Sequence, residues 1–144
     1  MRLITYPNDF LFKIMKPFDW DRLDPIQISN KMKDIMIKNG GIGISANQVG
    51  VNARIFVMKY QKDDSIITCI NPELIEESKE KVVRKEGCLS FPNVFQDIER
   101  SEIIRVKFLD IFHQSYIMSL SDIDARCFLH ELDHLNGKIF LFPN

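Results

Sequence analysis

The sequence predicts an α+β fold with mostly antiparallel strands, and three observations lead to this prediction. Residues 24–39 and 121–137 carry apolar side chains at helical spacing. Residues 53–70 contain two apolar runs of strand length, separated by a polar turn. Residues 102–110 alternate between apolar and polar side chains, and residues 114–120 follow after a short turn. We therefore expect the last two strands to pair with each other.

The first part of the chain is expected to contain little regular structure before one clear helix. Residues 1–23 form an irregular leader, in which Asp9 is a candidate cap for a short helical turn. Asp24 then provides an N-cap and Pro25 a first-turn residue, which together predict the start of a helix. The Asn-Gly-Gly sequence at residues 39–41 ends this helix.

The middle of the chain is predicted to form strands. Residues 53–59 and 66–70 are expected to be mostly buried strands. The Asn71-Pro72 pair is expected to end the second strand, because proline lacks the N–H that a strand ladder needs. Residues 73–85 are charged and partly alternating, as in a strand or hairpin with one solvated face. Residues 138–144 are expected to form a short closing strand.

A chain of 144 residues, 45% hydrophobic and 27% charged, has the size and composition of one globular domain, so residues 1–144 are expected to form a single domain. Its formal net charge of −1 gives no reason to expect nucleic-acid or membrane binding.

No apolar run approaches the roughly 20 residues that span a bilayer. Residues 1–7 lack the apolar core of a signal peptide. Three cysteines argue against a disulfide framework, and the chain is expected to be cytoplasmic.

The last predicted helix begins with Ser121 as a cap and carries the sequence HExxH, which is typical of metal sites. His130 and His134 lie at i and i+4 on one face, so they are able to bind one ion together. Glu131 is turned roughly 100° around the helix axis. Its carboxylate would lie beside the ion, where it suits a base acting on metal-bound water. Gly137 offers a helix stop. A helix with partly buried or solvated histidines is the alternative.

Two further segments are candidates for the same site. Residues 41–50, GIGISANQVG, combine small residues that allow close backbone approach with the amide side chain of Gln48. A phosphate-binding loop is excluded because no strand precedes the segment and the required third glycine or Gly-Lys-Ser/Thr is missing. A tight turn between a helix and a strand is the alternative. Cys88 follows a glycine and is a candidate third metal ligand, since catalytic zinc-type sites use three protein ligands.

Three segments occur in a characteristic order: GIGISANQ at residues 41–48, EGCLS at residues 86–90 and HELDHLNG at residues 130–137. Together they resemble peptide deformylases, metal-dependent hydrolases that remove the N-formyl group from the N-terminal formyl-methionine of newly made proteins and release formate. The resemblance implies antiparallel sheets around a central C-terminal helix that supplies two metal ligands. It also implies one divalent ion, with ferrous iron as the native metal and zinc, nickel or cobalt as substitutes.

The resemblance also assigns roles to individual residues. The implied metal ligands are Cys88, His130 and His134, and Glu131 is the implied proton-transfer group. The oxyanion would be stabilised by the side-chain amide of Gln48 and the backbone N–H of Leu89. The other implied site residues are Ile42 and Gly43, whose backbone pairs with the substrate; Ile123, Arg126 and Cys127, which line the methionine pocket; and Glu86 and Arg100, which orient His130, with a surface charge pair as the alternative for these two.

The implied substrates are N-formyl-methionyl peptides and nascent chains, acted on by a monomer that binds no nucleic acid. Many bacterial members continue into a C-terminal helix implicated in ribosome contact. This chain ends ten residues after His134 and is similar to short, phage-borne members. We therefore expect weakened ribosome association and, for a phage-encoded protein, location in the host cytoplasm.

Two residues depart from the family pattern. Ser45 stands where the family usually has alanine, and its added hydroxyl needs a hydrogen-bond partner. Leu129 stands where the family usually has glutamine directly before the first histidine. This second substitution removes a polar support near the metal.

The sequence leaves three other interpretations open. A zinc endopeptidase would take its third ligand from a downstream His or Glu, and neither residue type occurs after His134. A degenerate deformylase would bind formyl-methionyl ends without cleaving them, although all implied ligands and Glu131 are present. A purely structural metal would need a fourth protein ligand, for which Cys127, three residues before His130, is the nearest candidate.

Overall fold

The computed structural model describes residues 1–140. The described helices are η1 (Asp9–Phe12), α1 (Pro25–Lys38), η2 (Ala46–Val49) and α2 (Asp122–Leu135), of which η1 and η2 are short 3-10 helices. The described strands are β1 (Gly43–Ser45), β2 (Ile55–Tyr60), β3 (Ser65–Glu77), β4 (Lys81–Cys88), β5 (Phe91–Ser101), β6 (Ile103–Leu109) and β7 (Ser115–Ser121).

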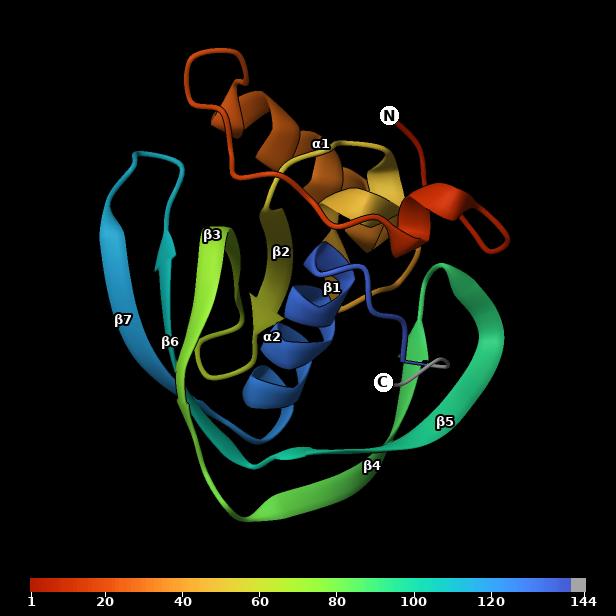
Figure 1. The fold of residues 1–144 in the computed structure, drawn as a ribbon, viewed down its shortest axis with the longest axis vertical. Coiled ribbons are helices and arrows are strands. Elements are labelled where there is room, and N and C mark those ends of the chain that lie inside the picture. Colours follow the sequence, from red (N-terminus) through yellow and green to blue (C-terminus); the bar gives the residue numbers. More distant parts are fainter. Residues whose placement is uncertain (141–144) are drawn as a thin grey trace.

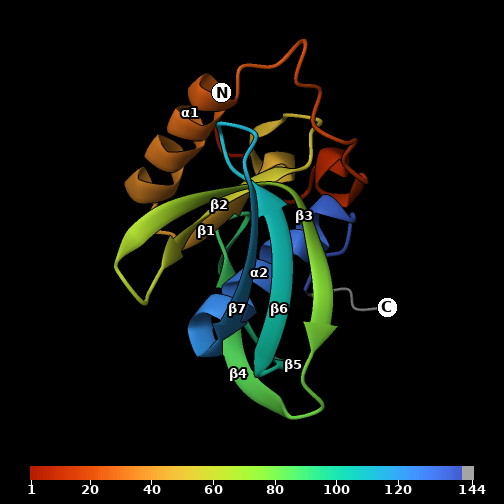
Figure 2. The ribbon, with the colours of Figure 1, turned by 90° about the vertical axis from the view of Figure 1, so that its left-hand side faces the viewer.

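The strands form two sheets in which every pair of neighbours described is antiparallel. One sheet has five strands in the order β1-β2-β3-β6-β7, and the other is the β4–β5 hairpin. Figure 1 shows α2, in blue, in the middle of the molecule, with the larger sheet on one side and the long curved hairpin wrapped around the other. In Figure 2, β1 and β2 lie between α1 and α2. The predicted α+β fold around a central C-terminal helix is confirmed.

Helix α1 forms where the sequence predicts it. The Asp24 carboxylate accepts hydrogen bonds from the backbone N–H groups of Ile26 and Gln27, which satisfies two donors at the helix start. Its apolar stripe is buried against β1 and β2. One polar contact joins α1 to β3, where the hydroxyls of Ser29 and Thr68 lie 2.6 Å apart. The helix therefore covers the face of the sheet opposite α2 (Figure 2).

The predicted strand break at Asn71-Pro72 is wrong. Strand β3 continues through both residues to Glu77, and its pairing with β6 shifts register between Ile70 and Glu73. Asn71 adopts a left-handed φ of 49°, and its backbone N–H donates to the carbonyl of Arg54, in register with the pairing of β2 and β3. A bulge accommodates a proline without a missing ladder bond, so the strand bends here and does not end.

The structure differs from the sequence predictions at three further places. Strand β5 was not predicted, because Pro92 and several charged residues hide its alternation. The cap of η1 is Asn8, not Asp9, since the Asn8 side chain accepts from the N–H of Phe10. Residues 138–140 are not in a strand, and residues 141–144 of the predicted closing strand lie outside the described residues.

Helix α2 is buried along most of its length. It packs on both sheets, and the rings of Phe128 and Phe56 meet edge to face with centroids 5.0 Å apart. Ser121 occupies the N-cap position, but its side chain makes no capping hydrogen bond. Within residues 1–140, neither α1 nor α2 has the length and hydrophobicity of a membrane-spanning helix. The buried residues of α2 are Asp124, Ala125, Cys127, Phe128, His130, Glu131, Leu132, His134 and Leu135.

Residues 1–23, the leader, pack closely against the C-terminal end of α2 at Gly137, and a substitution there tests this contact. Gly137 has a φ of 73°, and an added Cβ would lie 2.6 Å from the carbonyl oxygen of Phe12. We expect Gly137→Ala to lower the free energy of unfolding by about 2 kcal/mol or more, since the left-handed backbone alone costs an L-residue ~1–2 kcal/mol. Urea unfolding measures the change.

Gly40→Ala is the matched control. Gly40 has a similar φ of 69°, but nothing lies within 4 Å of an added Cβ. This variant should show only the backbone effect. Equal losses of stability in Gly40→Ala and Gly137→Ala would contradict the close approach of the leader to α2.

Candidate functional site

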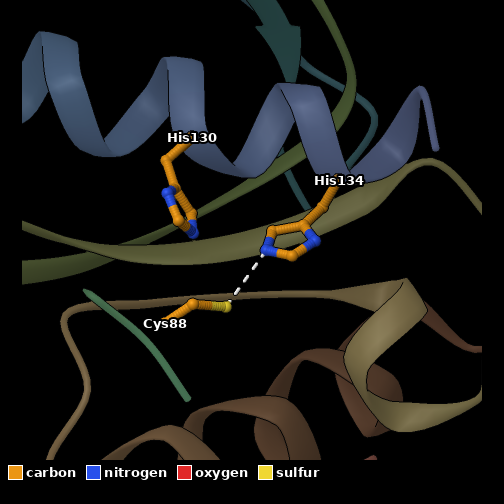
Figure 3. A group of neighbouring side chains, drawn as sticks. All are labelled: Cys88, His130 and His134. Carbon is orange, nitrogen blue, oxygen red and sulfur yellow. Dashed lines mark hydrogen bonds between the residues drawn. The ribbon is translucent and has the colours of Figure 1, made fainter. Parts of the chain in front are cut away.

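Three potential metal ligands meet between α2 and the hairpin. Figure 3 shows the rings of His130 and His134 projecting from α2 toward Cys88, which lies on the facing segment. The Cys88 Sγ and the His134 Nε2 are 3.3 Å apart. One ligand atom from each of the three residues lies within 4.8 Å of the others. The site therefore combines one sulfur and two imidazole nitrogens, a donor set that suits zinc, iron and similar ions.

Cys88 reaches this position through the geometry of the hairpin. It is the last residue of β4, and the pairing with β5 shifts register between Gly87 and Cys88. Such an irregularity re-aims the following side chain. Cys88 is half-buried. The register shift after Gly87 therefore sets the position of the Cys88 thiol.

Glu86 connects the hairpin to the metal helix. This buried carboxylate lies 2.8 Å from the Nδ1 of His130, leaving the other ring nitrogen for a metal. Arg100 donates two hydrogen bonds to it, from Nε at 2.6 Å and from NH2 at 3.0 Å. Burial opposes ionisation, but the contacts with His130 and Arg100 outweigh it and lower the pKa of Glu86 to about 2. The carboxylate is thus negatively charged at neutral pH.

Arg126 makes a further connection that sequence reasoning missed. The resemblance assigned Arg126 only to the lining of the methionine pocket. Its guanidinium donates to the Glu86 carboxylate at 2.6 Å, to the carbonyl of Val82 at 2.6 Å and to that of Ile98 at 2.9 Å. One residue of α2 therefore binds both strands of the hairpin. These partners lie 28 to 44 residues away in the chain, so no local pattern signals the contact.

Glu131 is buried beside the ligands and faces β1. Its Oε1 has no hydrogen-bond partner within residues 1–140, and burial raises its pKa to about 7. A Cβ added to Gly43 would lie 2.6 Å from the Oε2 of Glu131, so a larger residue at this position would displace the carboxylate. Burial also holds the pKa of His134 well below its usual value, which favours the neutral, metal-binding imidazole. These residues fit a bound divalent ion.

Gln48 is delivered to the site by η2. Its Ser-x-x-Gln sequence is that of a capping box, in which the fourth side chain reaches back to the cap residue. The backbone N–H of Ser45 donates to Gln48 Oε1 at 3.0 Å, and the Ser45 hydroxyl lies 3.2 Å from the same oxygen. The Gln48 Nε2 points the other way and lies 3.5 Å from Cys88 Sγ. The extra hydroxyl of Ser45 thus has a partner.

A cleft of about 730 Å³ opens onto these residues. Apart from His134 and Arg100, every residue that the sequence analysis assigned to the site lines it. The apolar residues of its wall that sequence reasoning missed include Leu3, Phe91, Pro92, Val94 and Phe95.

Cys127 lines the cleft but does not join the ligand group. Its thiol donates to the carbonyl of Ile42 at 3.5 Å, and in the described part of the chain the group contains only Cys88, His130 and His134. Three ligands leave a coordination position open for water or substrate. The arrangement therefore favours a catalytic metal over a purely structural one.

The comparisons with known proteins agree with this geometry. The polypeptide deformylase family model matches residues 1–142. The chain belongs to this family. It is 38% identical over 142 residues to the peptide deformylase of Borreliella burgdorferi, with 98% of this chain and 86% of that protein covered.

Two solved structures of the family are similar to this one. The peptide deformylase of Thermotoga maritima has a TM-score of 0.92 at 36% identity, covering 97% of this chain and 94% of that one. The deformylase of Vibrio parahaemolyticus bacteriophage VP16T, in complex with actinonin, has a TM-score of 0.89 at 29% identity, covering 96% and 99%.

Membership of the deformylase family determines the activity. The chain is a metal-dependent hydrolase that removes the N-formyl group from the N-terminal formyl-methionine of newly made proteins, releasing formate. The resemblance found in the sequence is confirmed. The endopeptidase and binding-only interpretations are set aside.

The cysteines provide a test of the site. Cys69 and Cys127 are buried, and burial raises the pKa of both thiols well above the usual value. We therefore expect iodoacetamide to alkylate Cys88 first in the chelated protein, and zinc or nickel to protect it. Peptide mass spectrometry measures the rate at each cysteine, with denatured protein as the control in which all three react. Faster modification of Cys127 would contradict the placement of Cys88.

Proposed function

We propose that Cys88, His130 and His134 hold one divalent ion in this deformylase, and that Glu131 moves the proton. The observation that carries this proposal is the convergence of the three ligand atoms within 4.8 Å, next to a buried carboxylate that lines the cleft. When bound, the ion supplies Lewis-acid activation of water and of the formyl carbonyl. The protein supplies everything else that the reaction needs.

The substrate backbone binds along β1. This strand forms one edge of the five-stranded sheet, and Ile42 and Gly43 line the cleft. An extended peptide added at such an edge gains main-chain hydrogen bonds. The absence of a side chain at Gly43 keeps the peptide close to Glu131. This placement brings the formyl group between Glu131 and Gln48.

Two hydrogen-bond donors are in position to stabilise the negative charge that develops on the formyl oxygen. The side-chain amide of Gln48 points its nitrogen toward Cys88. The backbone N–H of Leu89 follows directly after that ligand, and Leu89 also lines the cleft. Fixed donors stabilise a transition-state oxyanion because they need no reorganisation. The Gln48 amide and the Leu89 N–H therefore form the oxyanion hole.

Glu131 carries the proton through the reaction. Its carboxylate accepts a proton as water attacks the formyl carbon, and then delivers that proton to the leaving amine. The C–N bond breaks, and formate and a free N-terminal methionine result. A pKa near 7 suits a group that must both accept and donate at neutral pH.

The methionine side chain is assigned to the apolar part of the cleft next to α2. Ile123, Arg126 and Cys127 line this region. The Arg126 guanidinium is held by Glu86 and two hairpin carbonyls, so its stem is free to contact the substrate.

The proposal extends to the ion and the setting of the reaction. Ferrous iron is the proposed native ion, as the family resemblance implies. One thiolate and two imidazoles suit iron, zinc and nickel alike. The enzyme is proposed to act as a monomer on nascent chains in the cytoplasm, with residues 1–144 as one catalytic domain. Its net charge of −1 supports only weak association with the ribosome, whose surface is rich in phosphate.

The decisive assay is formate release from formyl-Met-Ala-Ser. Protein loaded anaerobically with ferrous iron, or separately with nickel, is expected to release formate, and a chelator should abolish the activity. Fully metallated protein that releases none would overturn the proposed site.

Glu131→Gln tests the proton-transfer role. This variant should keep its metal but lose roughly 10²–10⁴ in kcat, the usual contribution of a positioned acid or base. Formate release and metal analysis on the same sample measure both properties. Undiminished turnover would remove Glu131 from the mechanism.

Glu86→Gln tests the orientation of His130. Loss of the charged acceptor should weaken zinc affinity about 10–100-fold, the range for outer-shell partners of metal ligands. Competition with a chromophoric chelator measures the affinity. Glu99→Gln, which changes an exposed carboxylate on the same hairpin, is the control and should leave affinity unchanged. Equal affinities for the two variants would rule out the role of Glu86.

A further inference from the structure

Ser90 occupies a position that the mechanism above does not use. It is fully buried, two residues after the Cys88 ligand. Its hydroxyl donates to the carbonyl of Ile4 at 2.6 Å and lies 3.0 Å from the Nε2 of Gln48. A carbonyl oxygen only accepts hydrogen bonds, so the single hydroxyl proton of Ser90 points at Ile4. Ser90 must therefore accept from its other neighbour.

This requirement determines which end of the Gln48 amide faces Ser90. The amide carries an oxygen that only accepts and a nitrogen that only donates. Because Ser90 accepts, the nitrogen must face it. An amide turned by 180° would place an oxygen against an oxygen that has no proton left to share.

The opposite end of the amide is constrained independently. The backbone N–H of Ser45 only donates, and it lies 3.0 Å from the Oε1 of Gln48. The Ser45 hydroxyl lies 3.2 Å from the same atom and adds a second donor. Both ends therefore require the same orientation. The Nε2 has one hydrogen for Ser90, and the other remains on the side of Cys88 and the cleft.

We propose that Ser90, assisted by the hydroxyl of Ser45, is a positioning residue for the reaction: it holds the Gln48 amide with an N–H toward the formyl oxygen. This inference rests on the proposed role of Gln48 in the oxyanion hole. Ser90 is itself held by Ile4, whose backbone N–H donates to the Gln48 carbonyl at 2.6 Å. The leader thus takes part in positioning the oxyanion hole.

A double-mutant cycle between Ser90 and Gln48 tests the inference. Ser90→Ala should lower kcat about tenfold, the factor associated with one buried hydrogen bond, with little change in KM. Gln48→Ala should cost on the order of 10²–10³ in kcat. Adding Ser90→Ala to Gln48→Ala should cause no further loss, because Ser90 acts only through the amide.

Control variants separate positioning from folding. Ser29→Ala removes another buried hydroxyl, which contacts Thr68 on the far side of the sheet, and should leave kcat unchanged. Ser45→Ala keeps the backbone N–H, so it should fold normally and lower kcat by about threefold. This variant keeps the inference testable if Ser90→Ala does not fold. Metal content and the visible spectrum of the cobalt-loaded protein should match the wild type in all folded variants.

The outcomes distinguish the two proposals. A Gln48→Ala enzyme with full kcat would overturn the oxyanion role of Gln48 and the positioning role with it. A large loss in Gln48→Ala, combined with a further tenfold loss on adding Ser90→Ala, would overturn the positioning role alone. Wild-type kcat in both Ser90→Ala and Ser45→Ala would also overturn it.

Discussion

A carboxylate inside a protein is stable only where donors and positive charges surround it, and Glu86 meets this condition through residues of β5 and α2. Arg100 and Arg126 bind the carboxylate from these two elements, and His130 contacts it from α2. The same group therefore holds the hairpin against the helix and orients the ring of His130, a proposed metal ligand. Cys88, two residues further on, depends on this contact for its distance from the histidines.

A buried ion pair is a weak source of stability, because desolvation offsets much of the attraction. The main effect of this ion-pair network is to fix the position of the hairpin relative to α2. Removing any one partner leaves a charge or a carbonyl buried without compensation, so the network has few alternative arrangements. The helix and the hairpin are held in register by charge and hydrogen bonds, whereas the five-stranded sheet on the other side of α2 relies on apolar packing.

Tertiary contacts also accommodate individual residues whose type alone predicts a different local outcome. Ser45 departs from the family pattern, and its hydroxyl contacts the Gln48 amide and so is satisfied. Leu129, the other departure, packs against the apolar core, consistent with the loss of a polar side chain at that position. At Asn71 and Pro72, a bulge lets β3 continue where propensity alone predicts a break. In each case tertiary contacts change the outcome expected from the residue type.

The sequence by itself determined the fold class, the HExxH helix and its two candidate histidine ligands, because these depend on short-range spacing. Periodicity identifies α1 and most strands, and an i,i+4 pair places two imidazoles on one face. Only the tertiary structure decided what supports those ligands. The contacts of Arg126 and Ser90 join residues 28 to 86 positions apart, and their geometry follows from hairpin curvature and the docking of the leader. Long-range contacts of this kind leave no periodic trace in the sequence, since chain folding alone brings the partners together.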